Sequence, residues 1–572
     1  MRRVLMLALG ALISATAIAA AQQSDSSAAA TTATPAPPRT LTTQLRDRVN
    51  GSMSIYNELY GTSSDDLRRP GSTWRFMASP RFRLLGATEF GLDITLSTEG
   101  SDLRQGINQI ALEPSWNWGQ AHAGYFTRNY TSYTMEGLRI LGGGLDVHFP
   151  KIRASVQAGR SQSALPATID GSTYERTVIG GSVGYGKESG TFFDIRLVRA
   201  RDDSTSAAPP AIDTLGLDTL AADLRPQGIN RPQSNAVVSV GGQLALLRRT
   251  LRIQGEVAGG LVTRDLGAPK VNTDSVSVPL NGLGETRTSS SADVAWKVEG
   301  MYNRALYGLR AGYERVNPGF TSLGVAYLIS DRLAWHADGN LNLLKGGLVL
   351  QGRYQTQHDN LRGQKLFTTT RDMVTAAVMG RLTNGVTLTA VGLLNSGLND
   401  AANDTLLVDN RSTALNPAIG IPWRLARRGA LLSVGYGFQM SEDKNPIRRI
   451  PRTLVHTANV AVTLPVTANV SITPMGSAVL ANGAGGGDNQ RNVLGGCRVA
   501  AKFINGKLGV TGQFTQTFVA AREVTGGMGQ LSYTLPWQLA LSVQGRYNRY
   551  GAIGSRPAFN ERFLTSTVSR SF

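Results

Sequence analysis

Cysteine is almost absent from this 572-residue sequence, and long hydrophobic runs are scarce. The single cysteine, Cys497, cannot form a disulfide within the chain, which excludes a disulfide framework. After the first twenty residues, no stretch approaches the roughly 20 predominantly apolar residues that a membrane-spanning helix needs. Two classes remain open: a secreted soluble protein, and a membrane protein whose polar and apolar residues alternate along strands.

Metal-binding patterns are also missing. The chain has five histidines and no His/Cys cluster with the spacing of a zinc site. Asp400, Asp404 and Asp409 make one loop rich in oxygen ligands, but their spacing does not match a calcium-binding EF-hand loop. We therefore expect no metal and no cofactor.

Candidate catalytic pairs are few. Asp146 and His148 are two residues apart and share a strand face, as do His336 and Asp338. Such pairs could orient a general base, but no Gly-x-Ser-x-Gly nucleophile motif accompanies them. Polar residues satisfied by their neighbours are the simpler interpretation, so we do not expect an enzyme.

The N-terminal residues have the pattern of a secretory signal. Arg2 and Arg3 give a positive start, residues 4–20 are apolar, and three alanines before Gln22 form a small-residue cleavage site. We predict a cleaved signal peptide over residues 1–21. An uncleaved anchor helix is the alternative, and the lack of a second apolar helix argues against it.

The remainder divides by composition. Residues 22–43 are rich in Ser, Ala, Thr and Pro, which predicts a disordered linker too short to be a plug domain. Residues 44–572 have a uniform composition with many Gly, Thr, Val and Leu, so we predict one domain there. The formal net charge of the chain is +18. Such an excess suits lipopolysaccharide phosphates or anions in a lumen, although pairs such as Arg248-Arg249 in apparent turns explain part of it. For an exported chain without a recognition motif, we expect no nucleic-acid partner.

Strict alternation of apolar and polar residues is the strongest pattern. Apolar odd-numbered residues from Trp537 to Tyr547 alternate with polar even-numbered residues from Gln538 to Asn548. Period 2 is typical of a strand with one apolar face, and about ten residues is the length of a tilted membrane strand. The same alternation recurs at residues 251–261, 293–303, 333–343 and 508–515.

The connections favour a barrel over a soluble sandwich, which remains the alternative fold. Very short turns such as Asn505-Gly506, Asn384-Gly385 and Lys345-Gly346-Gly347 contrast with polar loops predicted at residues 201–234, 265–289, 357–370 and 396–416. Aromatic residues near strand ends suit the two membrane interfaces. We predict an all-β fold: a single large antiparallel transmembrane β-barrel of roughly 22–26 strands without a plug domain.

Two segments carry a resemblance to known proteins. Leu564, Val568 and Phe572 lie on one face of the final predicted strand, although Ser566 and Arg570 share that face. This resembles the C-terminal strand of bacterial outer-membrane barrels, whose terminal aromatic is read by the barrel-assembly machinery. The glycine- and tyrosine-rich region 125–160 and residues 313–320 are similar to uncharacterised, porin-like outer-membrane proteins. The resemblance implies a bacterial outer-membrane location and brings no known activity.

The charged residues on the polar strand faces are the functional candidates. By alternation, we predict that a lumen is lined by Arg252, Glu256, Lys297, Glu299, Arg310, Glu314, Asp338, Arg353, Arg498, Gln544 and Arg546. Charged side chains of this kind set solute selectivity in pores. Opposed charges such as Arg310 and Glu314 could equally brace the wall or tie down an inserted loop.

We therefore predict a passive, porin-like pore for small polar or anionic solutes, exported to the outer membrane and monomeric, with lipid and lipopolysaccharide as partners. The alternative is a structural or interaction barrel with an occluded lumen, whose long loops bind a partner, a polysaccharide or lipopolysaccharide.

Overall fold

Antiparallel strands make up most of the chain that the structure describes. The computed structural model describes residues 49–64, 69–84, 88–99, 108–168, 171–206, 231–271, 286–448, 452–482, 490–519, 522–554 and 556–572. The chain divides into two units, Met1–Asp47 and Arg48–Phe572. The predicted signal peptide and linker, residues 1–21 and 22–43, lie outside the described residues. No helix within these ranges is long and apolar enough to cross a membrane.

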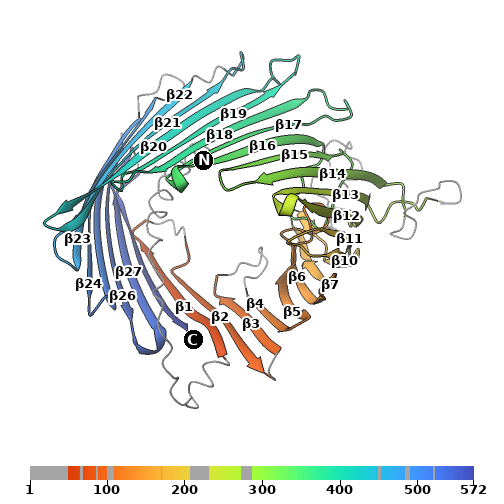
Figure 1. Ribbon diagram of the computed structural model, residues 1–572, viewed down its shortest axis with the longest axis horizontal. Helices are drawn as coiled ribbons and strands as arrows, with labels where there is room; N and C mark the ends of the chain where they lie inside the picture. The colour runs from red at the N-terminus through yellow and green to blue at the C-terminus, as the bar shows by residue number, and fades with distance from the viewer. Residues whose placement is uncertain are drawn as a thin grey trace. The chain divides into compact units, whose positions relative to one another are not determined.

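Each strand pairs mainly with its neighbours in sequence (Figure 1). The first half of the chain forms β1 (Val49–Thr62), β2 (Ser72–Leu84), β3 (Thr88–Ser97), β4 (Gln109–Trp116), β5 (Gly119–Thr127), β6 (Arg139–His148), β7 (Ile152–Gln162), β8 (Leu165–Thr168), β9 (Gly171–Thr173), β10 (Arg176–Gly186), β11 (Phe192–Asp202), β12 (Ser234–Leu246), β13 (Leu251–Thr263) and β14 (Ser290–Asn303). The second half forms β15 (Tyr307–Val316), β16 (Arg332–Leu343), β17 (Leu348–His358), β18 (Thr369–Arg381), β19 (Thr387–Asn399), β20 (Asp409–Leu425), β21 (Arg428–Asp443), β22 (Thr453–Pro465), β23 (Val470–Asn482), β24 (Gln490–Phe503), β25 (Leu508–Val519), β26 (Arg522–Thr534), β27 (Leu539–Tyr550) and β28 (Phe559–Ser571).

The sheet closes on itself. β7 pairs with β10, since β8 and β9 form a separate hairpin in the connection between them. β1 pairs with β28 from Ser52 to Thr62, and backbone hydrogen bonds of 2.8 and 3.0 Å join Gly51 to Phe572 beyond that ladder. The predicted all-β antiparallel barrel is therefore confirmed, and 26 strands of the described chain form it.

Short turns join the strands at one rim, and most connections at the other rim are longer loops, with the exception of the two residues between β25 and β26. The predicted turn at Asn505-Gly506 has positive φ at both residues, 54° and 83°, a conformation that asparagine and glycine tolerate best. Three further short turns are single 3-10 turns, η4 (Leu247–Arg249), η6 (Leu344–Gly346) and η7 (Pro536–Gln538). The long loops lie between odd- and even-numbered strands such as β11 and β12, or β13 and β14.

Two predicted boundaries were wrong. The loop predicted over residues 396–416 is limited to residues 400–408, because β19 continues to Asn399 and β20 begins at Asp409. Trp537 was predicted to start a strand, but it lies in the turn η7 with φ 61° and is 81% exposed. Its apolar–polar spacing continues that of β27 by coincidence, since periodicity does not register the change in backbone direction after Pro536.

Candidate functional site

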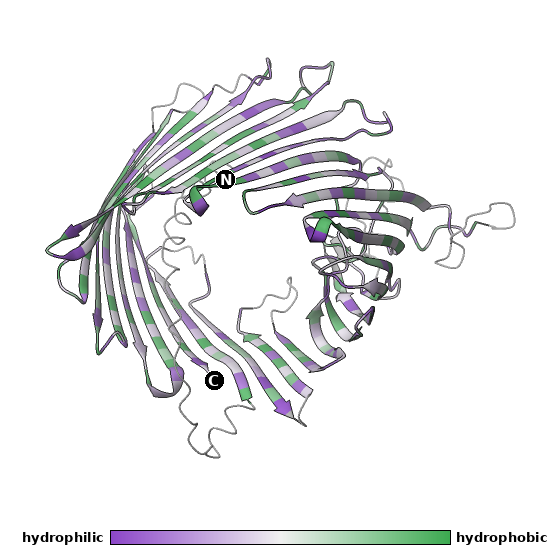
Figure 2. Cartoon of the chain, viewed as in Figure 1, coloured by the Kyte–Doolittle hydropathy of each residue, from purple (hydrophilic) through white to green (hydrophobic). Residues whose placement is uncertain are grey.

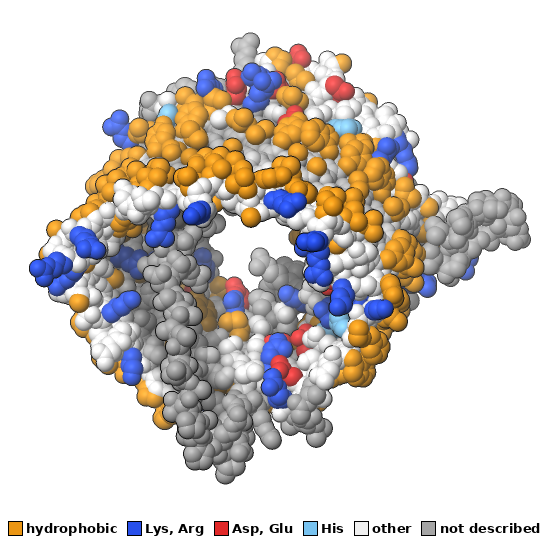
Figure 3. All heavy atoms as spheres, viewed as in Figure 1, with side chains coloured by type: hydrophobic (Ala, Val, Ile, Leu, Met, Phe, Trp, Pro, Cys, Tyr) orange, Lys and Arg blue, Asp and Glu red, His pale blue; other side chains and the backbone are white. Residues whose placement is uncertain are grey.

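The two faces of the closed sheet differ sharply in exposure. On β10, Val178 is fully buried while its neighbour Ile179 is 58% exposed; on β13, Ala258 is fully buried while Val257 is 59% exposed. Successive residues of a strand point to opposite faces. One face, which we call the outer face, therefore carries exposed apolar side chains, and the opposite inner face lines the lumen. Figure 2 shows the alternation as bands along each strand, and Figure 3 shows apolar side chains gathered on the outside.

A loop after β5 covers part of the inner face. Residues 128–138, which we call the first inner loop, connect β5 to β6. Tyr133, Thr134 and Met135 have no exposed surface. Met135 belongs to an apolar cluster with Phe126, Ile140, Val178, Val198 and Ala200. The loop thus forms a dry core with the inner face of β6, β10 and β11.

A second loop packs beside the first. Residues 317–331, the second inner loop, connect β15 to β16. Phe320 is fully buried and meets the Tyr133 ring edge-on, with centroids 5.9 Å apart. The Glu136 amide donates to the carbonyl of Gly324 (3.1 Å), and a Cβ at position 324 would lie 2.2 Å from a backbone oxygen of the first loop. Only glycine fits this close approach of the two inner loops.

Polar contacts fix the first inner loop to the wall. The Tyr133 hydroxyl donates to Glu314 (3.0 Å), and Arg332 donates to the other oxygen of that carboxylate (2.5 Å). Burial raises the pKa of Tyr133, and the charge of Glu314 raises it further, so the hydroxyl remains a donor. Lys297 donates to the hydroxyl of Ser132 (2.7 Å). The loop is therefore held by charged residues of β14, β15 and β16.

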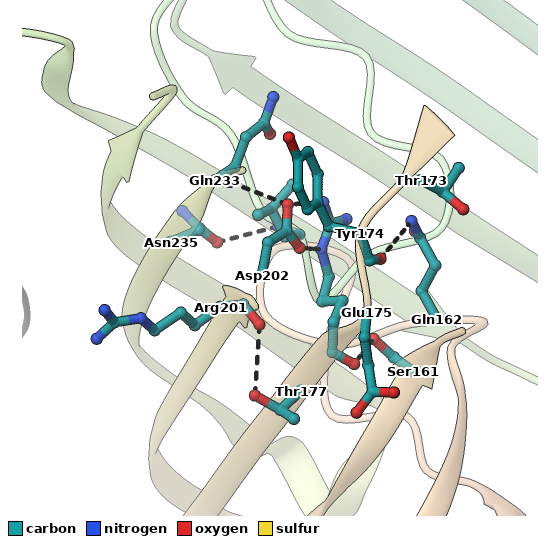
Figure 4. A network of polar contacts seen from close by, with 12 residues as sticks. Ser161, Gln162, Thr173, Tyr174, Glu175, Thr177, Arg201, Asp202, Gln233 and Asn235 are labelled. Atoms are coloured by element: carbon teal, nitrogen blue, oxygen red, sulfur yellow. Dashed lines mark hydrogen bonds and ion pairs between the residues drawn. The ribbon is translucent and has the colours of Figure 1, made fainter. Parts of the chain in front are cut away.

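Asn235 at the start of β12 fixes the second inner loop. Its amide nitrogen donates to the carbonyl of Thr321 (2.9 Å), and its oxygen accepts from the amide of Leu323 (3.0 Å). Figure 4 shows Asn235 beside a polar network at the long-loop rim. In that network both oxygens of the buried Asp202 accept from Arg176, at 2.6 and 3.0 Å. The inner loop is thus tied to a rim that is itself cross-linked.

A third loop, residues 359–368 between β17 and β18, fastens the end of the second inner loop. Asp331 accepts from the amides of Asn360 (3.0 Å) and Leu361 (2.8 Å), and its carboxylate lies 2.6 Å from the Lys365 ammonium. Burial raises the pKa of Asp331, but the hydrogen bonds from Lys365 and from both amides outweigh it, so the pKa lies below its ordinary value. This junction joins two extended connections through one carboxylate.

One of the two histidine pairs considered as catalytic candidates is brought together: His336 Nε2 lies 3.6 Å from Asp338 Oδ2. The other pair, Asp146 and His148, is arranged differently from the sequence expectation. Among the described residues Asp146 forms no hydrogen bond or ion pair with His148. Its carboxylate lies 2.9 Å from Nε2 of the buried His122 of β5 and pairs with Arg128, whose guanidinium also lies 2.8 Å from that nitrogen. The other ring nitrogen of His122 lies 3.3 Å from Glu113. Both nitrogens are thus engaged at the base of the first inner loop. Among the residues with described positions, no group of three or more His, Cys, Asp or Glu could hold a metal ion.

The eleven residues predicted to line the lumen all have the strand parity of the inner face. Most of those on β13 to β17 form ion pairs: Glu256 with Lys297 (3.4 Å), Glu299 with Arg310 (2.6 Å), Glu314 with Arg332 (2.5 Å) and Asp338 with Arg353 (3.3 Å). Arg310 and Glu314 are not partners of each other. Glu314 instead holds the first inner loop, which is one of the two roles left open for it.

The remaining predicted arginines have no acidic partner. Within the described ranges, no carboxylate forms an ion pair with Arg252, Arg498 or Arg546, and the same holds for Arg522 of β26. The Arg546 guanidinium lies 4.2 Å from the ring centroid of Phe563. An arginine stacked on an aromatic ring keeps its planar donor edge free for a carboxylate or phosphate.

A buried acid on β28, the strand that carries Phe563, already has two hydrogen-bond donors. Glu561 on β28 is buried, and its two oxygens accept from the hydroxyls of Tyr60 (3.0 Å) and Tyr550 (2.9 Å). Arg522 lies 4.8 Å from the ring centroids of Tyr550 and Phe559. The inner face of β26 to β28 therefore carries arginines that aromatic rings position and no acid neutralises.

Sequence reasoning missed several inner-face residues. Asp194 and Arg196 alternate with the exposed Ile195 and Leu197, so the period-2 pattern that found Arg252 could have found them. Tyr133 gave no such signal, because its burial depends on residues about 180 positions away in the sequence.

Comparison with known proteins yields structural similarities alone. No protein-family model matches the chain, and no curated protein matches it. Among solved structures it is similar to OccK10 (OpdN) of Pseudomonas aeruginosa, at 11% identity over 69% of this chain and 99% of that one, with a TM-score of 0.35. It is similar to the translocation pore of the P pilus usher PapC, at 8% identity over 92% of this chain and 99% of that one, with a TM-score of 0.38. A third similar structure is the siderophore receptor PirA of Pseudomonas aeruginosa, at 12% identity over 92% of this chain and 80% of that one, with a TM-score of 0.39.

Proposed function

We propose that this protein is a passive pore of the bacterial outer membrane for small polar or anionic solutes. The observation that carries the proposal is a closed sheet whose outer face is apolar and whose inner face is charged. Exposed side chains such as Val183 (61%) and Val257 (59%) would be unfavourable in water as a continuous belt but suit lipid acyl chains. Because β1 pairs with β28, no strand edge is left open, and one chain suffices to span the bilayer.

The distribution of inner-face charge supports a preference for anions. The acids on β13 to β17 are neutralised by arginine and lysine, so that part of the wall contributes little net charge. Arg498, Arg522 and Arg546 lack acidic partners in the described chain and leave the opposite part of the wall positive. Figure 3 shows an opening with Lys and Arg side chains along its edge. Fixed positive charge beside an aqueous path favours anions.

Reversal potentials in a planar bilayer under a salt gradient test this proposal. The refolded protein should give stable conductance steps with anion preference. R498E and R546E should each lower the anion-to-cation permeability ratio severalfold, because each adds an unpaired carboxylate to the lumen. R249E is the matched control: Arg249 is exposed in the turn η4, so its reversal should leave the ratio unchanged.

A barrel that inserts but never conducts would overturn the pore. The interaction barrel, with its loops binding a partner or lipopolysaccharide, would then be the better explanation. Cation preference in the unmodified protein would leave a pore but refute the role given to the arginines.

We also propose that the last strand directs assembly in the outer membrane. Leu564 and Val568 lie on the outer face, 45% and 36% exposed, and share strand parity with Phe572. F572A should reduce the amount of heat-modifiable barrel in outer-membrane fractions, whereas V568L should not. Equal assembly of F572A and the unmodified protein would refute a role for the aromatic residue.

A further inference from the structure

A polar cavity lies between the first inner loop and the wall. Its volume is about 260 Å³, and its lining includes Thr131, Ser132 and Glu136 from the loop and Gln254, Glu256 and Lys297 from β13 and β14. Cavities of this size are slightly below the range of about 300–1,000 Å³ that holds drug-sized ligands. The space therefore suits one small molecule and not an extended chain.

A glycine in the wall makes room for the cavity. Gly241 on β12 lies opposite Glu256 and has inner-face parity, so no side chain fills the space at this position. A Cβ at 241 would lie 3.1 Å from the Arg196 guanidinium and 3.3 Å from the Glu256 Cβ. A larger residue would push these two charged side chains, so the hollow depends on the glycine.

Glu256 is the residue that points to a ligand. Its side chain is 4% exposed, and one oxygen lies 3.4 Å from Lys297. The other oxygen, Oε1, is 3.9 Å from Arg196, too far for a hydrogen bond, and has no hydrogen-bond partner among the described residues. A buried carboxylate oxygen left without a donor is unfavourable, and native proteins rarely leave one so. The cavity is therefore suited to a molecule that donates a hydrogen bond to Oε1.

The other lining groups narrow the class of that molecule. Two acids, Glu136 and Glu256, face two bases, Arg196 and Lys297, so the cavity has no excess of either charge. Amide and hydroxyl groups add further donors and acceptors. Tyr130 and Phe192 contribute ring surface. Many alternating donors and acceptors with aromatic surface and no excess charge match a small ring that bears several hydroxyl groups.

We propose that this cavity binds a neutral, monosaccharide-sized polyol, with the Glu256 carboxylate accepting from a ligand hydroxyl. The inference deepens the proposed function, because it names a class of polar solute that the lumen holds on its way through. Binding requires only the folded barrel and does not require that the barrel conducts, so the two proposals can fail separately.

Titration calorimetry of the refolded full-length barrel with D-glucose, D-galactose and, as charged alternatives, glycine and inorganic phosphate tests the proposal. A monosaccharide should bind with a Kd on the order of 1 mM, the affinity expected for so few ligand atoms. E256Q should weaken that binding tenfold or more, and G241V should abolish it by filling the space. E442Q, which removes one carboxylate from β21 on another part of the wall, should bind like the unmodified protein.

Heat modifiability on gels shows that each variant is folded. Binding of glycine or phosphate without either sugar would overturn the ligand class, and no binding of any probe by the folded barrel would overturn the site. An equal loss of monosaccharide affinity in E256Q and E442Q would also refute the proposed site, since the effect would then not be specific to the cavity. A barrel that binds sugar but never conducts would refute the pore and leave the site standing.

Discussion

The membrane location rests on the outer face, and one substitution at the middle of a strand tests it. Val257 is the central residue of β13, points outward and is 59% exposed. If acyl chains cover this face, V257R places a guanidinium near the bilayer midplane, which costs about 2–4 kcal/mol in transmembrane barrels. That cost corresponds to a roughly 30-fold to 700-fold smaller equilibrium constant for folding. If water covers the face, an exposed Val to Arg change should alter stability by only about 0.5 kcal/mol.

Urea-dependent folding into liposomes, followed by tryptophan fluorescence and gel mobility, measures this difference. The matched control is Q513R. Gln513 also lies in the middle of its strand, β25, but has inner-face parity. A guanidinium there would remain in the aqueous lumen, so we expect a change below about 1 kcal/mol, since lumen positions tolerate charge. Equal, small effects of V257R and Q513R would refute the lipid-facing belt. Equal, large effects would mean that the lumen at this depth is not aqueous.

Three further predictions concern the inner loops. Y133F should lower the free energy of unfolding by about 0.5–1.5 kcal/mol, because it removes one donor from the partly exposed Glu314. Single-channel current noise should rise with it; unchanged noise would show that the loop does not border the current path. G324A should destabilise the barrel by about 1–3 kcal/mol in urea titrations, because the added methyl group overlaps a backbone oxygen of the first inner loop; an unchanged midpoint would contradict the described contact. The pKa of Asp331 lies below its ordinary value of 3.8. Its ion pair with Lys365 therefore stabilises the protein above pH 3.8, and this stabilisation is lost as the pH falls through the lowered pKa. Limited proteolysis by pepsin should cut loop 359–368 faster in acid in the unmodified protein, and D331N should remove that pH dependence.

The alternation of apolar and polar residues predicted which face of the barrel each strand residue occupies, because the pleat of a strand is a local property. Arg252 and Val257 lie on opposite faces for no reason other than the pleat of the strand, and this holds wherever the strand sits in the barrel. The same reasoning gave the parity of Arg498 and Arg546. The Asn505-Gly506 turn was predicted from another local property, the tolerance of asparagine and glycine for positive φ. Alternation was misled at Trp537, where the spacing continued while the backbone turned.

The inner loops could not be predicted in the same way. Tyr133 and Phe320 are nearly 190 residues apart, and they are buried together in a cluster with Val237, Ala258, Ala295 and Val316 of the wall. Nothing periodic precedes them, and the short segment around Tyr133 reads as an ordinary polar connection. Resemblance drew attention to both segments but gave no reason for their burial. The reason is tertiary: the loops pair through Glu136 and Gly324.

The inner loops also explain why apolar side chains occur on the inner face of the barrel. Val178, Val198 and Val237 have inner-face parity and would meet water in an open lumen, yet each is almost completely buried. Their burial by the loops removes apolar surface from water, and each side chain contributes about 1.5–3 kcal/mol by this effect.

A loop that moved away from the wall would expose this surface together with the unpaired backbone of both loops. Opening of the two inner loops is therefore energetically unfavourable, which makes them poor candidates for a gate. In the proposed pore, selectivity would then depend on the contrast between the charge-paired inner face of β13 to β17 and the inner face of β24 to β28, where Arg498, Arg522 and Arg546 have no acidic partner among the described residues.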